Sequence, residues 1–347
     1  MQTRAEEILE AVVRLNIETG RPVSSGLVER YLQRACSSAT IRNVMKGLED
    51  DGLLEQPHTS AGRRPTDRGF RRYVDRMLAG WPLARWDVPR PLAQQVESEL
   101  ANNAGNHAMI KALARNLTAL TSGVGIILGP SWEQVRCLRV DLYRRGERRL
   151  LMVLVLENAM VRTTVADPGE DILPRTLEDA GRLLSERIAG RTVAEVRDGV
   201  LDSFRPGVTA ASRCASRLAG QGRDLFMDFE SGELELEGVA AVLGEPEFEA
   251  PGTLRNLVRF LESPRSIREA LTRLDREAHG GLGVWIGREN PVPDLREFAV
   301  VSHRFPLAGR EGILAVLGPR RMPYQRALTG IDTLRDGLRT LSHEEIQ

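Results

Sequence analysis

The sequence predicts an α+β multidomain protein, and three observations support this fold class. The chain has 347 residues, which is too long for one small domain. Its first part carries apolar residues at helical spacing, whereas later parts contain short β-branched runs bounded by turn residues. Because 41% of the residues are hydrophobic, each domain can bury a core.

Residues 1–78 are expected to form three short helices, a small hairpin and the start of a fourth helix. Apolar residues recur at helical spacing in 4–19, 25–34 and 39–51. Ser38 is expected to be the N-cap of the third helix, and Gly52 is expected to end it. This order of elements is typical of a winged helix-turn-helix, so we predict that 1–78 is a winged-helix DNA-binding domain.

In a winged helix the third helix enters the major groove and presents its N-terminal residues to base edges. Arginine pairs with guanine through two hydrogen bonds, and asparagine pairs with adenine in the same way. The alternative is an ordinary solvated helix face, which also contains such residue types. The residues expected to face outward from this helix are Ser38, Thr40, Arg42, Asn43 and Lys46.

The hairpin and the following helix carry a local excess of positive charge. Six arginines and only two aspartates lie between residues 63 and 76, although the whole chain has a formal net charge of zero. A solvated basic loop is the alternative, but the helix, the tip and the flank occur together, which favours DNA binding through phosphates. The residues expected to contact phosphate are His58, Arg63, Arg64, Arg68 and Arg71.

The remaining chain is expected to contain a sheet domain built from two distant segments. Residues 79–104 are interpreted as a linker because prolines, glycines and tryptophans gather in its first half, although helices are expected at 92–101 and 106–120. A helix is expected at 172–190 and another at 329–345. The expected strands are 123–130, 137–143, 150–157, 160–167, 283–287, 297–305 and 312–319.

The sheet domain is therefore assigned to 105–191 and 279–347. Residues 192–278 between them are mostly polar with helical periodicity, interrupted by a short acidic stretch at 229–238. We predict that 192–278 is an inserted helical domain. Its amphipathic faces suit an oligomer contact, and a simple helical cap is the alternative.

Other classes of protein receive little support from the sequence. The three cysteines are far apart and show no metal-binding spacing, the histidines are scattered, and no catalytic or cofactor motif is present. We expect no enzyme activity, no cofactor and no metal. The absence of a signal-like or membrane-spanning run, together with the cysteine pattern, predicts a cytoplasmic protein.

The segment 37–75 resembles the HrcA family of heat-inducible transcription repressors, and so do the shorter stretches 17–25, 286–290 and 318–324. The resemblance covers nearly the whole chain. It departs from the family at Arg320, where a threonine is usual, and around residues 34–37.

The resemblance implies three domains: the winged helix, a GAF-like sheet domain and a dimerisation domain inserted in it. It also implies a homodimer that binds double-stranded DNA at the inverted-repeat operator called CIRCE and represses chaperone operons. GroEL, the partner chaperonin, would keep the repressor active until heat draws GroEL to unfolded clients. A different reading stays open, because GAF-like domains often bind small molecules, and Trp285, Arg288 and Glu289 would then line a pocket.

Overall fold

The computed structural model describes most of the chain. The described residues are 4–33, 36–58, 62–81, 87–102, 106–146, 149–157, 160–169, 172–227, 232–249, 251–278, 281–307 and 309–344. Helices and several antiparallel sheets are both present, so the α+β class is confirmed.

The chain divides into two compact units. The first contains Met1–Leu128, Leu234–Leu307 and Glu311–Gln347, and the second contains Gly129–Glu233 with Ala308–Arg310. The interruption of the main sheet is therefore 129–233, and the expected bounds of 192–278 are wrong. The strands expected at 137–167 belong to the second unit, where among the described residues they form a sheet of their own.

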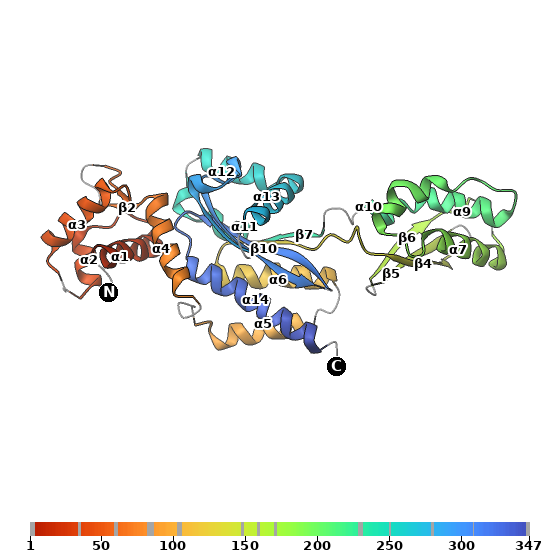
Figure 1. Ribbon diagram of the computed structural model, residues 1–347, viewed down its shortest axis with the longest axis horizontal. Coiled ribbons are helices and arrows are strands. Elements are labelled where there is room, and N and C mark those ends of the chain that lie inside the picture. The colour runs from red at the N-terminus through yellow and green to blue at the C-terminus, as the bar shows by residue number, and fades with distance from the viewer. Residues whose placement is uncertain are drawn as a thin grey trace. The chain divides into compact units, whose positions relative to one another are not determined.

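The N-terminal part of the first unit, which we call the head (residues 4–81), has the expected order of elements (Figure 1). Its elements are α1 (Arg4–Thr19), α2 (Ser25–Tyr31), α3 (Ser38–Asp50), β1 (Leu54–Glu55), β2 (Arg64–Pro65) and α4 (Asp67–Ala79). The apolar residues of α1, α3 and α4 face inward, with Val12, Ile41 and Val74 fully buried. Ser37, and not Ser38, is the N-cap of α3, and Gly52 follows the helix with a φ of +72°.

The rest of the first unit, which we call the core, is built on a five-stranded sheet in the order β7-β3-β10-β9-β8. The strands are β3 (Val124–Leu128), β7 (Leu234–Glu237), β8 (Leu282–Ile286), β9 (Phe298–Leu307) and β10 (Arg310–Pro319). The two apolar strands that end in Gly-Pro, β3 and β10, are antiparallel neighbours with Leu128 opposite Ile313. Strand β7 lies in the acidic stretch 229–238, which was not among the expected strands.

Helices cover both faces of this sheet (Figure 1). On one side lie α5 (Arg90–Asn102), α6 (Asn106–Thr121) and α14 (Tyr324–Glu344), and on the other lie α11 (Val239–Leu243), α12 (Pro251–Leu261) and α13 (Pro264–Glu277). Helix α5 packs against α6 and α14, so the second half of the expected linker 79–104 is part of the core.

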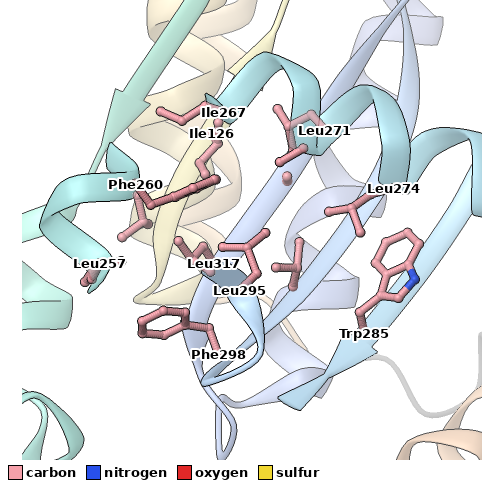
Figure 2. Close-up of a cluster of buried hydrophobic side chains, with 14 of the residues drawn as sticks. Ile126, Leu257, Phe260, Ile267, Leu271, Leu274, Trp285, Leu295, Phe298 and Leu317 are labelled. Carbon is pink, nitrogen blue, oxygen red and sulfur yellow. The ribbon is translucent and has the colours of Figure 1, made fainter. Parts of the chain in front are cut away.

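Buried side chains fill the space between the sheet and the helices α12 and α13. Figure 2 shows Phe260, Ile267 and Leu271 from the helices meeting Ile126 and Leu317 from the strands. Each of these five side chains is buried. Burial of this apolar surface is the main stabilising contribution to the core.

The second unit is a three-stranded antiparallel sheet covered by helices on one face. Its order is β4-β5-β6. The Oγ of Ser185 in α7 bonds both the N–H and the carbonyl of Val140, which fixes that helix on β4. The elements are β4 (Cys137–Arg144), β5 (Leu150–Leu156), β6 (Val161–Ala166), α7 (Pro174–Ile188), α8 (Val193–Glu195), α9 (Ala210–Gln221) and α10 (Asp224–Met227), with a π-helical turn at Val196–Val200 and a 3-10 turn at Leu201–Ser203. The 3-10 turns at Pro246–Glu249, Gly287–Glu289 and Pro293–Leu295 belong to the first unit.

Among the described residues, no helix combines the length and the apolar character that crossing a membrane requires.

Candidate nucleic-acid interface

Helix α3 presents a polar face to solvent. Arg42, Asn43 and Lys46 are exposed, whereas Ile41 and Met45 on the opposite side are buried. Residues three and four positions apart are neighbours on a helix surface, so Lys46 lies beside both Asn43 and Arg42. Within the described part of the chain, neither Arg42 nor Lys46 makes an ion pair, and the face is therefore available to a ligand.

The first turn of α3 is held by serine and threonine hydroxyls. Ser37 Oγ accepts a hydrogen bond from the backbone N–H of Thr40 and lies 2.9 Å from Thr40 Oγ1. Ser38 is half-buried, and its Oγ lies 2.9 Å from Ser25 Oγ at the start of α2. Thr40 is thus exposed at the beginning of the helix, while Ser38 positions α2 against α3.

The hairpin arginines differ in what surrounds them. Arg63 is only 15% exposed, and its Nε donates to Glu49 Oε2 of α3 at 2.9 Å. Arg64 is 50% exposed and pairs across the hairpin with Glu55 at 2.6 Å. Arg63 therefore fixes the hairpin on the end of α3, and Arg64 is the more accessible of the two cations.

The base of the hairpin also joins the segment before α2. Val23 and Arg63 exchange two backbone hydrogen bonds of 2.7 and 2.9 Å. A Cβ atom at Gly62 would lie 2.4 Å from the carbonyl oxygen of Val23, so this close approach requires glycine.

Two further predicted residues lie on the surface near the hairpin. His58 is exposed at the end of the described residues before the tip, and the tip residues 59–61 are outside the described residues. Arg68 is exposed, and its guanidinium lies over the turn at Gly52. Both side chains are placed to contact a ligand beside the hairpin.

Arg71 is engaged by the core. Its Nε donates to both carboxylate oxygens of Glu289 at 3.1 and 3.0 Å, and its Nη2 donates to Glu289 Oε2 at 2.6 Å and to the carbonyl of Val284 at 2.5 Å. Burial lowers the pKa of Arg71, but the hydrogen bonds and negative charges of Glu289 and Asp75 raise it by a larger amount. The net result is a pKa above the ordinary value of arginine. The expected phosphate contact of Arg71 does not agree with this geometry, because the guanidinium is already occupied.

The partners of these arginines lie far from them in the sequence and were not predicted. Trp285, one of the residues considered for a ligand pocket, is buried in the core cluster, and Glu289 binds Arg71. The backbone N–H of Arg288 donates to Asp67 of α4 at 3.0 Å. The available signal was the concentration of charged residues in the segments 66–75, 286–290 and 318–324, which also carry the family resemblance.

No group of three or more His, Cys, Asp or Glu side chains that suits a metal ion occurs among the described residues. Burial raises the pKa of the Cys137 thiol to about 12, which makes a thiolate unavailable there.

Comparison with known proteins identifies the class as transcription repressors. The family model described as "HrcA protein C terminal domain" matches residues 107–328. A relative from Xanthomonas euvesicatoria pv. vesicatoria (strain 85-10), named heat-inducible transcription repressor HrcA, is 28% identical over 339 residues, covering 97% of this chain and 95% of its own. A protein of the same name from Chlorobium phaeobacteroides (strain BS1) is 28% identical over 345 residues and covers 97% of both chains.

A solved structure has the same fold over nearly the whole chain. It is a crystal structure of a protein described only as hypothetical, with a TM-score of 0.74, 27% sequence identity and 97% coverage of both chains. The chain belongs to the HrcA family of heat-inducible transcription repressors.

Proposed function

We propose that this protein is a dimeric repressor whose head is a winged helix that reads an inverted-repeat operator of the CIRCE type upstream of chaperone genes. The observation that carries the proposal is the polar face of α3, where Arg42, Asn43 and Lys46 are exposed on a helix fixed by buried apolar residues. Membership of the HrcA family supports the repressor role.

The head residues divide into three roles in this proposal. Thr40, Arg42 and Asn43 contact base edges, where a good bidentate contact discriminates by about 1–3 kcal/mol. Lys46, His58, Arg64 and Arg68 contact phosphates and set the register without reading sequence. The remaining predicted residues position these elements, and they are Ser38, Arg63 and Arg71.

An open sheet face in the second unit supports a homodimer. Tyr143, Leu151 and Val165 lie side by side in register on the face opposite the one where Ser185 bonds Val140, and Val153, Val155 and Val161 continue this face. Tyr143, Val161 and Val165 are 55%, 53% and 53% exposed. The same face also carries Thr163 and the ion pair between Arg139 and Asp141. Exposed apolar side chains grouped on one sheet face suit an interaction site, and a two-fold dimer would bury the same face on both copies.

The topology of the first unit supports dependence on the GroEL chaperonin. Strand β3 pairs with β7 and with β10, although the second unit separates β3 from both in the sequence. Pairing of such distant segments slows folding and leaves apolar surface exposed in the meantime. We infer that heat relieves repression when unfolded clients occupy the chaperonin. Refolding of the denatured chain to full operator binding without GroEL would contradict this inference.

The packing of the core favours this mechanism over a small-molecule sensor. The sheet face beneath α12 and α13 is covered by the side chains of Leu257, Phe260, Ile267, Leu271 and Leu274 (Figure 2). A ligand on that face would have to displace them. A thermal-shift screen with small molecules separates the two mechanisms, and a ligand-dependent shift would favour the sensor.

Competition binding tests the repressor proposal. A labelled CIRCE-type inverted-repeat duplex would be titrated with the purified chain, with and without GroEL, in the presence of excess scrambled duplex. The proposal expects the repeat to remain bound. Equal affinity for both duplexes would leave a DNA-binding protein with another operator, and no binding even with GroEL would contradict the proposal.

A further inference from the structure

We propose that a polar contact between the head and the core sets the half-site spacing that this repressor accepts. We call this contact the head–core latch, and its residues are Asp67, Arg71, Glu289 and Arg320. The inference rests on the proposed function, and it assigns positioning roles to residues of two motifs that lie more than two hundred positions apart in the chain.

The first half of the latch is the pair between Arg71 of α4 and Glu289. Three donor–acceptor distances of 2.6 to 3.1 Å join the guanidinium to both carboxylate oxygens, and a fourth bond reaches the carbonyl of Val284 in β8. Both side chains are partly shielded, with exposures of 26% and 32%. A bidentate arginine–carboxylate pair fixes direction as well as distance, so this contact restrains rotation of α4 against the sheet edge.

The second half of the latch is Asp67, in the first turn of the same helix. Its Oδ2 accepts from the backbone N–H of Arg288, and its Oδ1 accepts from Nη1 of Arg320, both at 3.0 Å. Gly287 has a φ of +57°, and a Cβ atom there would lie 2.3 Å from the Asp67 carboxylate. The core thus has a recess that fits this carboxylate, and Arg320, the residue that departs from the family pattern, adds a charge-assisted bond to it.

Contacts outside the latch hold a second element of the head. Arg321 donates from Nη1 to the carbonyl of Ile17 in α1 at 3.2 Å and lies against Gly20, while Glu245 and Glu247 hold its guanidinium. The head is therefore attached through both α1 and α4, and its orientation is determined rather than merely its distance from the core.

The latch is connected to the reading helix through short, rigid steps. Strand β2 leads directly into α4 through Thr66, whose Oγ1 donates to the carbonyl of Gly52 at the end of α3. Arg63, next to β2, pairs with Glu49 of α3. A change in the direction of α4 therefore turns α3 with it. In a symmetric dimer, the separation and direction of the two reading helices determine the half-site spacing.

The chain offers a matched pair of substitutions on opposite sides of α4. Glu289→Gln removes the partner of Arg71 in the core, whereas Glu6→Gln removes the partner of Arg72 within the head, where the distance is 2.7 Å. Both substitutions delete one negative charge, so their general effects on attraction to DNA are the same. Arg320→Ala tests the Asp67 half of the latch at a side chain that is 47% exposed and does not belong to the buried core.

The experiment measures affinity of the full chain for CIRCE-type duplexes whose spacer is lengthened or shortened in steps of one base pair, and for a duplex with one arm scrambled. Wild type and Glu6→Gln should prefer one spacer. Glu289→Gln and Arg320→Ala should keep half-site binding, while their preference for that spacer falls by about tenfold, equal to about 1.4 kcal/mol.

Spacer profiles that match the wild type in both latch variants would overturn the inference and leave the proposed function intact. Failure of the wild type to bind any of the duplexes would instead overturn the proposed function. Equal loss of spacer preference in Glu6→Gln would also overturn the inference, because the effect would then follow from charge alone.

Discussion

Replacing Gly62 by alanine should destabilise the head even in the absence of DNA. The new Cβ atom would lie 2.4 Å from the carbonyl oxygen of Val23 and 2.9 Å from the backbone nitrogen of Ser24, and backbone atoms cannot yield as a flexible side chain can. Relief of this overlap separates Val23 from Arg63, and their two hydrogen bonds of 2.7 and 2.9 Å are lost.

Loss of a typical intramolecular hydrogen bond costs about 0.5–1.5 kcal/mol, so the free energy of unfolding should fall by about 1–3 kcal/mol. Urea denaturation would measure this change, and hydrogen exchange at Val23 and Arg63 would locate it. Gly47→Ala is the control, because a Cβ atom there meets nothing within 4 Å inside α3. That substitution should stabilise the helix by about 0.5–1 kcal/mol.

An unchanged urea midpoint and unchanged exchange in Gly62→Ala would refute this reasoning. If operator affinity then fell alone, the glycine would serve close approach to DNA rather than the bridge to Val23.

Three further predictions concern DNA reading, dimer formation and pH. Arg42→Ala and Asn43→Ala should each reduce the discrimination between repeat and scrambled duplex by about 1–3 kcal/mol. Arg64→Ala should instead reduce the slope of log affinity against log salt concentration by about 0.9. Titrations over a salt series would check both, and equal slopes for Arg64→Ala and wild type would contradict the phosphate role of Arg64. Val165→Asp should convert the dimer to monomers in sedimentation. Val208→Asp, at a loop residue that is 96% exposed, should leave the dimer intact. A dimeric Val165→Asp variant would exclude the open sheet face as the dimer interface. Burial lowers the pKa of His303 from 6.5 to about 4, so between these values the unfolded chain binds a proton more readily than the folded chain. The free energy of unfolding should therefore fall as the pH decreases through this range. His303→Gln should flatten that part of the profile of stability against pH, and an unchanged profile would contradict the lowered pKa of His303.

The helical order of the head follows from local sequence. Helices α1 and α3 have apolar residues at helical spacing, and Gly52 lies where the left-handed conformation after α3 is needed. The same periodicity predicts that Arg42, Asn43 and Lys46 face outward. These features depend on residues within a few positions of each other, which is why the sequence alone was sufficient.

The partition of the strands between two sheets could not be predicted in this way. Strand β5 is as apolar as β3, whereas β4 and β6 mix apolar and polar residues, and neither pattern indicates which sheet a strand joins. Strand β7 alternates Leu and Glu over only four residues, and its place beside β3 is determined by pairing across the whole second unit.

The partners of the arginines were beyond local reasoning for a related reason. Arg63 pairs with Glu49, 14 positions earlier, and Arg71 pairs with Glu289, 218 positions later. A basic side chain near a predicted DNA-binding helix has the same sequence pattern whether it contacts phosphate or a distant carboxylate. Only the folded arrangement separates Arg64 and Arg68, which remain exposed, from Arg63 and Arg71.

Hydroxyl-radical footprinting on a CIRCE-type inverted repeat tests the central claim most directly. A dimer that reads the repeat with one α3 helix per arm should protect both arms equally and symmetrically about the centre, and Asn43→Ala should weaken both protections together. Protection of a single arm, or uniform protection that does not depend on the repeat, would contradict the account.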